Sequence, residues 1–254
     1  MMQLTCNRKA GLRACFFLVV LTSSSAWAQE ASAVPPAYAV QTMSAVGATG
    51  LGLTPSARPA NWGEVSSGFH NTIPGSPRPT GYNFLFTVGF LPGAEVNGRL
   101  ATQNLQCNMY GLGDNPCKEP VDRDVSASFK FGHSLLLQNG WTLSGSLGTT
   151  DYGGAATLNR SYYAVVGLDK GPWSLTSGYG KPTKGYSPLH GGFGTLAWSP
   201  VSTFTGYAEV LGSRAWVGAK AFLPEKYSPW SSRVYVGFQH QVAGTPGVAQ
   251  KSWV

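Results

Sequence analysis

Trp141-Thr-Leu-Ser-Gly-Ser-Leu-Gly148 is the stretch of this chain that decides its fold. Trp141, Leu143, Gly145 and Leu147 alternate with threonine, serine and glycine at the positions between them. A period of two residues is typical of a β-strand, because successive side chains of a strand point to opposite faces of its sheet. The stretch therefore predicts a strand with one apolar face and one face of small polar groups.

Ten further stretches between residues 64 and 240 have the same length and period. They are Glu64–Asn71, Tyr82–Phe90, Ala94–Thr102, Asp124–Phe131, Ser161–Asp169, Trp173–Gly180, Gly191–Trp198, Thr203–Leu211, Ala215–Leu223 and Arg233–His240. Strands with one apolar and one polar face suit a transmembrane β-barrel, in which one face meets lipid and the other a lumen. Such barrels prefer an even number of strands, so we expect Ser44–Leu53 to be the twelfth, pairing with the last strand to close the ring. The competing candidate is the C-terminal tail Val242–Val254, but glycine and proline interrupt it.

The connections between these strands alternate in length. Short turns at 91–93, 138–140, 170–172 and 199–202 alternate with longer segments at 72–81, 103–123, 149–160 and 181–190. Bacterial outer-membrane barrels have short periplasmic turns and long outer loops. The pattern weakens near the end of the chain, where 212–213 is tight and 224–232 is longer. We therefore predict an all-β, antiparallel transmembrane barrel of about 12 strands.

Two soluble folds are alternatives to the membrane barrel. A β-sandwich also has alternating strands, but it usually carries more surface charge than the 11% of charged residues found here. A lipocalin-like soluble barrel would need only about eight strands.

Residues 1–28 have the three parts of a cleavable secretory signal peptide. These parts are the basic residues Arg8, Lys9 and Arg13, the apolar run Cys15–Leu21, and the small-residue cleavage site Ala26-Trp-Ala28. An uncleaved anchor is the alternative, but a spanning helix needs about 20 apolar residues and this run is shorter. The domain organisation that follows is a signal peptide at 1–28, a flexible leader at 29–43, the barrel at 44–241 and a C-terminal tail at 242–254.

Cleavage would lower the formal charge of +7 to +4, because three basic residues leave with the signal. A mild positive excess without clustered Lys and Arg does not indicate nucleic acid as a partner. Cys107 and Cys117 stay in the exported chain, and an oxidising compartment favours a disulfide between them. A metal site is the alternative, but neither histidine nor further cysteine lies nearby.

Charged residues in mid-strand are the candidate functional groups. They are Glu95, Arg99, Lys130, Glu209, Lys220 and Arg233. A lysine or arginine facing lipid at mid-depth costs about 2–4 kcal/mol, so we expect these side chains to point into the lumen. They would form either a structural network of ion pairs or a polar path for a hydrophilic ligand such as a glycan. We expect the aromatic residues near strand ends to form interfacial girdles, with sugar-stacking platforms as the alternative. They are Trp62, Tyr82, Trp141, Trp173, Trp198, Trp216 and Trp230.

Little in the sequence indicates catalysis or the binding of a cofactor or metal. His133 and Ser134 resemble the pair used by outer-membrane acyl hydrolases, but adjacent residues of a strand point to opposite faces. His70, His190 and His240 have no carboxylate at a recognisable spacing, so we expect them to be solvated or interfacial. The glycine-rich runs do not open a helix, so they are not expected to bind phosphate. We predict no catalytic residue, no metal and no cofactor.

Several motifs resemble the YjbH family in the order that the family has them. They are Gly50-Leu-Gly-Leu-Thr-Pro-Ser-Ala-Arg58, Trp62-Gly-Glu64, the hairpin from Phe84 to Arg99, Asp124–Lys130, Asp151-Tyr-Gly-Gly154, Tyr162–Val166, Gly191-Gly-Phe-Gly194 and Tyr207-Ala-Glu209. The resemblance covers residues 47–223 and identifies a short, single-barrel relative, because members of the family are typically longer.

The resemblance implies an outer-membrane β-barrel associated with production or export of an exopolysaccharide or capsule in a Gram-negative bacterium. We therefore expect a non-enzymatic protein of the outer membrane whose partners are lipid, a polysaccharide and periplasmic export components. The alternatives are a small general diffusion porin and, from another class, a lipid-modifying outer-membrane enzyme.

Overall fold

The structure is a computed structural model that describes residues 42–72, 80–102, 124–154, 160–183, 189–227, 234–244 and 251–253. All of these residues belong to one of the two units of the chain, Pro36–Val254. The predicted signal peptide, the Cys107–Cys117 pair, Trp230 and Arg233 lie outside the described residues.

The described part of the chain is all-β, as predicted, with two short 3₁₀ turns and no α-helix. The strands are β1 (Thr42–Met43), β2 (Thr49–Gly50), β3 (Val65–Thr72), β4 (Thr80–Leu91), β5 (Ala94–Thr102), β6 (Asp124–Leu136), β7 (Thr142–Thr150), β8 (Gly153–Gly154), β9 (Ser161–Lys170), β10 (Trp173–Pro182), β11 (Gly191–Val201), β12 (Phe204–Leu211), β13 (Arg214–Phe222), β14 (Tyr235–Ala243) and β15 (Lys251–Trp253). The 3₁₀ turns are Gln138–Gly140 and Glu225–Tyr227.

One large antiparallel sheet contains twelve of these strands in the order β3-β4-β5-β6-β7-β9-β10-β11-β12-β13-β14-β15, and β8 pairs with β6 beside this path. Each strand of the path pairs with the next strand of the path along the chain, as in an antiparallel meander, and only β8 is passed over between β7 and β9. All eleven predicted strands between residues 64 and 240 are found, most with bounds shifted by a few residues. Their period of two is a local signal, so it locates them well.

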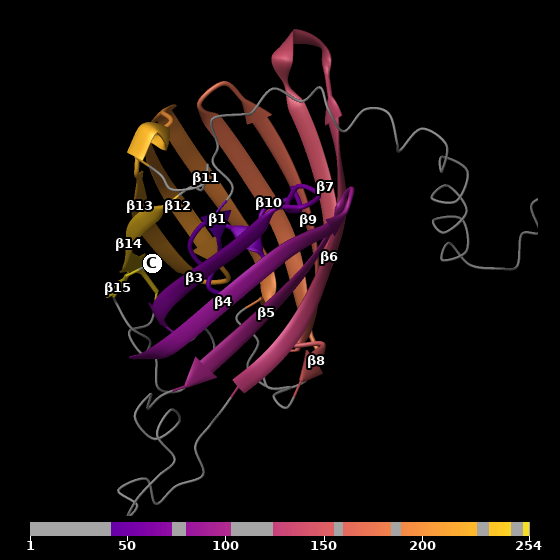
Figure 1. The fold of residues 1–254 in the computed structure, drawn as a ribbon, viewed down its shortest axis with the longest axis vertical. Coiled ribbons are helices and arrows are strands. Elements are labelled where there is room, and N and C mark those ends of the chain that lie inside the picture. The colour runs from indigo at the N-terminus through magenta and orange to yellow at the C-terminus, as the bar shows by residue number, and fades with distance from the viewer. Residues whose placement is uncertain are drawn as a thin grey trace, which may run out of the picture. The chain divides into compact units, whose positions relative to one another are not determined.

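The sheet is strongly curved, so that its two end strands approach each other (Figure 1). Register shifts interrupt the ladders β3–β4, β4–β5, β11–β12 and β13–β14. Such bulges bend a strand and increase its twist, which helps a sheet to curve. β15 lies beside β3. No ladder joins these two strands in the described part of the chain, so the sheet is not closed into a barrel by hydrogen bonds.

The prediction for the twelfth strand was wrong. Within Ser44–Leu53 only Thr49–Gly50 is a strand, and it pairs with Thr42–Met43 in a separate two-stranded sheet. The twelfth strand of the large sheet is β15, within the predicted C-terminal tail, which pairs with β14. Gly47 has a φ of 93° and turns the chain between β1 and β2, so this glycine-rich segment cannot form a strand long enough to join the large sheet.

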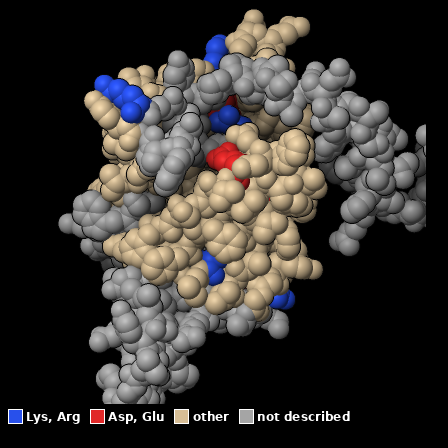
Figure 2. Space-filling view, in the orientation of Figure 1, with Lys and Arg blue, Asp and Glu red and all other residues tan. Residues whose placement is uncertain are grey.

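Apolar side chains lie on the outer face of the sheet and polar ones on its inner face. The outward group is Val125, Phe131, Leu143, Leu147, Val166, Leu175, Leu196, Val210, Val217 and Val236, all exposed. The buried inward group is Asn83, Thr87, Asn97, Ser126, Ser128, Ser144, Ser146, Thr176, Thr195, Thr205 and Gln239. Figure 2 shows one face of the molecule over β3–β6 with few charged side chains.

Trp216 does not lie in an outer girdle as predicted. It is buried on the inner face of β13, together with Lys220 and Phe222, because these three positions share one phase of the strand. Trp62, Trp173 and Trp198 are exposed, and the indole rings of Trp173 and Trp198 lie 6.1 Å apart on paired strands. Among the described residues, no helix is long and apolar enough to cross a membrane.

Candidate functional site: a segment bound inside the sheet

Residues 42–60, here called the inner segment, lie within the curve of the large sheet (Figure 1). Most of the segment is buried, and Ser44, Ala45 and Ala48 are fully inaccessible. Hydrogen bonds join it to strands near both ends of the strand order, for example to Asn83 of β4 and to Lys220 of β13. The inner segment therefore occupies space inside the curve of the sheet, where the sequence predicted a lumen.

Glu95 of β5 and Lys130 of β6 are paired across the ladder and form a buried ion pair of 3.3 Å. The Glu95 carboxylate also accepts hydrogen bonds from the inner segment. Thr49 donates its backbone N–H at 3.0 Å and its hydroxyl at 2.7 Å, and Ala60 donates its N–H at 2.7 Å. Both carboxylate oxygens are thus satisfied without water, as a buried charge requires.

The ammonium group of Lys130 binds oxygens of the same segment. It donates to the carbonyl of Thr49 at 3.1 Å, to that of Arg58 at 3.0 Å and to that of Ser56 at 3.3 Å, and it also contacts the Thr49 hydroxyl. Lys130 therefore holds two parts of the inner segment at one point, near Thr49 and near Arg58.

Glu209 of β12 is bound by three successive residues of the inner segment. The backbone N–H groups of Gly52, Leu53 and Thr54 donate to its carboxylate at 3.0, 2.7 and 3.3 Å, and the Thr54 hydroxyl donates at 2.7 Å. Successive N–H groups that converge on one anion form a nest, an arrangement that favours negative charge. In the described part of the chain, Glu209 forms no ion pair, so the nest and the hydroxyl of Thr195, at 3.4 Å, satisfy it.

A side chain at position 52 would not fit this arrangement. A Cβ added to Gly52 would collide with the side chains of Gln239 and Glu209. The absence of a side chain therefore allows the backbone to approach the carboxylate closely.

Lys220 of β13 binds residues of the inner segment that precede this nest in the sequence. Its ammonium group donates to the Thr42 hydroxyl at 2.8 Å, to the Leu51 carbonyl at 2.8 Å and to the Met43 carbonyl at 3.3 Å. It also lies 4.7 Å from the centroid of the Tyr235 ring, within range of a cation–π interaction. The Leu51 carbonyl and the Gly52 N–H belong to the same peptide group, so a lysine and a glutamate of the sheet bind its two ends.

Arg99 has a different partner from the other candidate residues. Its guanidinium pairs with Asp151 at 2.8 Å, and both side chains are buried. The structure thus brings Glu95, Lys130, Glu209 and Lys220 onto the inner segment, and it pairs Arg99 with Asp151, which lies between β7 and β8. Arg233 lies outside the described residues.

Neutral contacts complete the packing of the inner segment. Asn83 donates to the Ala45 carbonyl at 2.9 Å, and Thr87 donates to the Gly47 carbonyl at 2.6 Å. Apolar side chains of the segment join a buried cluster with residues of the sheet. The cluster includes Val46, Leu53 and Ala57 of the segment and Tyr163, Val165, Phe193, Leu211 and Trp216 of the sheet.

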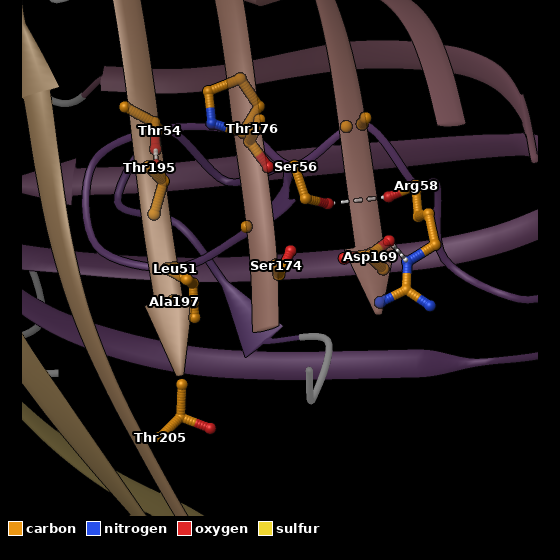
Figure 3. Close-up of a pocket in the computed structure, with 14 residues that line it drawn as sticks. Leu51, Thr54, Ser56, Arg58, Asp169, Ser174, Thr176, Thr195, Ala197 and Thr205 are labelled. Atoms are coloured by element: carbon orange, nitrogen blue, oxygen red, sulfur yellow. Dashed lines mark hydrogen bonds and ion pairs between the residues drawn. The ribbon is translucent and has the colours of Figure 1, made fainter. Parts of the chain in front are cut away.

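A small pocket remains between the inner segment and the inner face of β9–β12 (Figure 3). Six of its fourteen lining residues carry hydroxyl groups, among them Thr54, Thr176, Thr195 and Thr205, and an Arg58–Asp169 ion pair of 3.5 Å also lines it. Its volume is about 40 Å³. A cavity needs about 10–15 Å³ of such space to hold one water molecule, so the pocket suits a few waters and is far too small for a polysaccharide.

The histidines are not gathered into a reactive cluster. His133 is exposed, and the hydroxyl of Ser134 hydrogen-bonds that of Ser144 at 2.8 Å. His70 was expected to be solvated or interfacial but is buried, because its phase on β3 points inward. No group of three His, Cys, Asp or Glu residues that could hold a metal is found within the described ranges.

The inward charged residues of the sheet were predictable from the sequence, but the inner segment that they bind was not. Ser44–Leu53 was predicted to join the sheet, although three glycines, at positions 47, 50 and 52, leave little room for a long strand. The available signal for this segment was its run of glycine and small residues, whose backbone can approach a charged side chain closely.

Comparisons with known proteins return no match. No family model, no curated protein sequence and no solved structure resembles this chain closely enough to be significant.

Proposed function

We propose that this protein is an outer-membrane β-barrel whose lumen is filled by its own inner segment. The observation that carries the proposal is the reversed distribution of polarity, with apolar side chains outward on nearly every strand and charged side chains inward. Soluble proteins rarely expose contiguous apolar patches of more than a few hundred Å². A band of exposed leucine, valine and phenylalanine is what a lipid environment stabilises.

The buried charged residues also support a membrane environment. Glu95, Lys130, Glu209 and Lys220 are completely inaccessible and point away from the apolar face. Each of them binds backbone groups of the inner segment. The interior of this protein is therefore polar and fully hydrogen-bonded at these positions, whereas the exterior is apolar, which is the arrangement of a membrane barrel with a filled lumen.

The biological role that we propose is non-enzymatic assistance of exopolysaccharide production, export or surface assembly. It rests on the resemblance to the YjbH family, whose motif Gly50–Arg58 forms the part of the inner segment bound by Glu209 and Lys220. The filled lumen argues against a permanently open diffusion porin. It also makes the outer rim and the turns more suitable than the lumen as sites for partners.

Two measurements test the two parts of this proposal. Detergent-extracted protein should migrate differently on gels before and after boiling, and should fractionate with outer membranes; unchanged migration together with a soluble fraction would contradict the barrel. A clean deletion strain should lose surface polysaccharide, and re-expression should restore it. Unchanged polysaccharide in that strain would refute the biological role and leave the barrel standing.

A further inference from the structure

Three exposed tyrosines lie close together on the outer face of the sheet, at the end where β8 lies (Figure 1). Tyr152 precedes β8, Tyr162 belongs to β9 and Tyr179 to β10, and they are 49%, 49% and 62% exposed. The rings of Tyr152 and Tyr162 are 6.5 Å apart. Tyr179 is a diagonal neighbour of Tyr162 across the β9–β10 ladder, a separation that aromatic side chains can span. We call these three residues the tyrosine cluster.

Two basic side chains accompany the tyrosine cluster. The guanidinium carbon of Arg160 is 5.7 Å from the centroid of the Tyr152 ring, and the guanidinium donates to the carbonyls of Asp151 and Tyr152 at 3.2 and 2.9 Å. Lys181 is exposed and lies directly opposite Tyr162 in the ladder. Each of these two rings therefore has one cation beside it.

Acidic side chains do not neutralise these cations in the described part of the chain. Of the acidic side chains that the structure describes, only Asp151 lies at this end of the sheet, and it is buried and paired with Arg99 at 2.8 Å. The two nearest connections, 155–159 and 184–188, contain neither aspartate nor glutamate. The surface around the tyrosine cluster is therefore suited to an anionic ligand.

The backbone that presents Tyr152 is held in an uncommon conformation. Asp151 has a φ of 49°, in the left-handed region that residues other than glycine seldom adopt. Arg99 binds the Asp151 carboxylate, and the hydroxyl of Ser128 accepts the Asp151 backbone N–H at 2.9 Å. Conformations of this kind persist where surrounding contacts maintain them, and they are concentrated at functional sites. The buried Arg99–Asp151 pair therefore fixes the position of Tyr152 and of the Arg160 guanidinium bound beside it.

Open space lies beside the third tyrosine. The ladder partner of Tyr179 on β11 is Gly192, which has no side chain, and a Cβ added there would meet nothing within 4 Å. Tyrosines near strand ends also occur in interfacial girdles. A girdle does not require a guanidinium bound to a constrained turn or a free space beside a ring, so these features favour a ligand.

We propose that the tyrosine cluster, with Arg160 and Lys181, binds a chain of acidic sugars whose units carry carboxylate groups. A sugar ring packs its apolar face on an exposed aromatic ring, and the tyrosine hydroxyl can hydrogen-bond sugar hydroxyls. Guanidinium and ammonium groups bind carboxylates through charge-assisted hydrogen bonds. One cation beside each of two rings matches one carboxylate on each sugar unit. This inference rests on the proposed function and names the class of polysaccharide and the surface that binds it.

Calorimetric titration of the full-length protein in lipid nanodiscs tests the proposal. The probe is an oligogalacturonate, and a dextran oligosaccharide of the same length is the neutral comparison. The acidic probe should bind and the neutral one should not. Binding should weaken as salt is added, because salt screens interactions between exposed charges.

Two substitutions within the cluster locate the site. Tyr162→Ala and Lys181→Gln should each raise the Kd for oligogalacturonate about tenfold, since one removes a packing surface and the other a charge-assisted contact. Tyr227→Ala and Lys226→Gln are the matched controls. Tyr227 is 64% exposed and its ring centroid lies 4.6 Å from the Lys226 ammonium, but this pair follows β13 at the opposite end of the sheet. Both control variants should bind as the wild type does.

The other outcomes contradict the site in distinguishable ways. Equal binding of the two probes, or equal losses in the cluster and control variants, would show that the cluster does not recognise acidic sugars. Loss of co-purified phospholipid from the cluster variants, with sugar binding unchanged, would identify a lipid surface instead. Absence of binding by protein that keeps its heat-dependent migration would refute the site and leave the barrel standing. Normal surface polysaccharide in a deletion strain would refute the biological role, whatever the binding result.

Discussion

Glu95 and Lys130 illustrate how single residues of this chain have more than one partner. They satisfy each other across a ladder, and each also binds backbone groups of the inner segment. A buried ion pair often contributes little by itself, because removing two charges from water is costly. The contacts with Thr49 and Arg58 give this pair a second effect, which is to fix the position of a segment with few large side chains of its own.

At the residue scale, we predict that removing one member of this pair strongly destabilises the protein. Lys130→Met should lower the free energy of unfolding by about 3–5 kcal/mol, because it leaves Glu95 buried without its cation. Denaturant unfolding of the protein in lipid vesicles, followed by tryptophan fluorescence, measures this change. Lys226→Met is the control, because Lys226 is exposed, and a surface change should stay within about 0.5 kcal/mol.

The pair should also show coupling. Glu95→Gln combined with Lys130→Met should be less destabilised than the sum of the two single variants, since the double variant leaves no unpaired charge. Additive losses would show that Glu95 and Lys130 stabilise the protein independently of each other.

At the scale of elements, the strands of the large sheet differ in how they are held. Each strand of the path from β4 to β13 has a ladder of seven or more residue pairs on both sides, whereas β15 pairs with β14 at only three positions. β14 and β15 thus make the shortest ladder along the path of the large sheet. The inner segment is held in another way, by side chains of β5, β6, β12 and β13 that bind its backbone.

We predict that β15 matters for assembly in spite of its length. Truncation after Gly244 removes β15 and leaves backbone groups of Phe238, Gln239 and His240 without their ladder partners. An unpaired strand edge is unfavourable in lipid, so the yield of folded, heat-modifiable protein should fall at least several-fold. Gel migration of membrane extracts measures this yield.

Ser252→Ala provides the control for the truncation, because it leaves the backbone of β15 able to pair. It should assemble as the wild type does. Normal assembly of the truncated chain would show that the edge of β14 is satisfied without β15.

At the scale of the whole molecule, the apolar outer face predicts that a charged substitution has different effects in water and in a lipid bilayer. Leu147 is 66% exposed on the outer face of the sheet and lies near the middle of β7. In water, placing a charge at such a position would change stability by less than about 0.5 kcal/mol. In a bilayer, a charged side chain at mid-depth costs about 2–4 kcal/mol.

We therefore predict that Leu147→Arg lowers the free energy of unfolding in vesicles by about 2–4 kcal/mol. Val201→Arg is the matched control, because Val201 is also exposed but lies at the end of β11, where the effect of depth should be at most about 1 kcal/mol. Equal and small effects of the two substitutions would indicate that the outer face does not meet lipid.

The sequence by itself determined where most strands lie and which face of each strand is apolar. Residues such as Leu143, Ser144, Glu95 and Lys130 reveal their faces through neighbours two positions away, and this information is local. The predicted bounds therefore agree with the structure along most of the chain. The same local signal could not identify the twelfth strand, because β15 is short and follows a segment broken by glycine and proline.

Only the tertiary structure decided what fills the sheet. Gly52 and Glu209 are 157 positions apart, and nothing in the sequence around either residue indicates the other. The nest forms because the curvature of the sheet carries β12 opposite the inner segment, and curvature depends on the bulges and ladders of many strands together. The charges of the wall were therefore predictable from their phase, whereas their partners depended on the path of the whole chain.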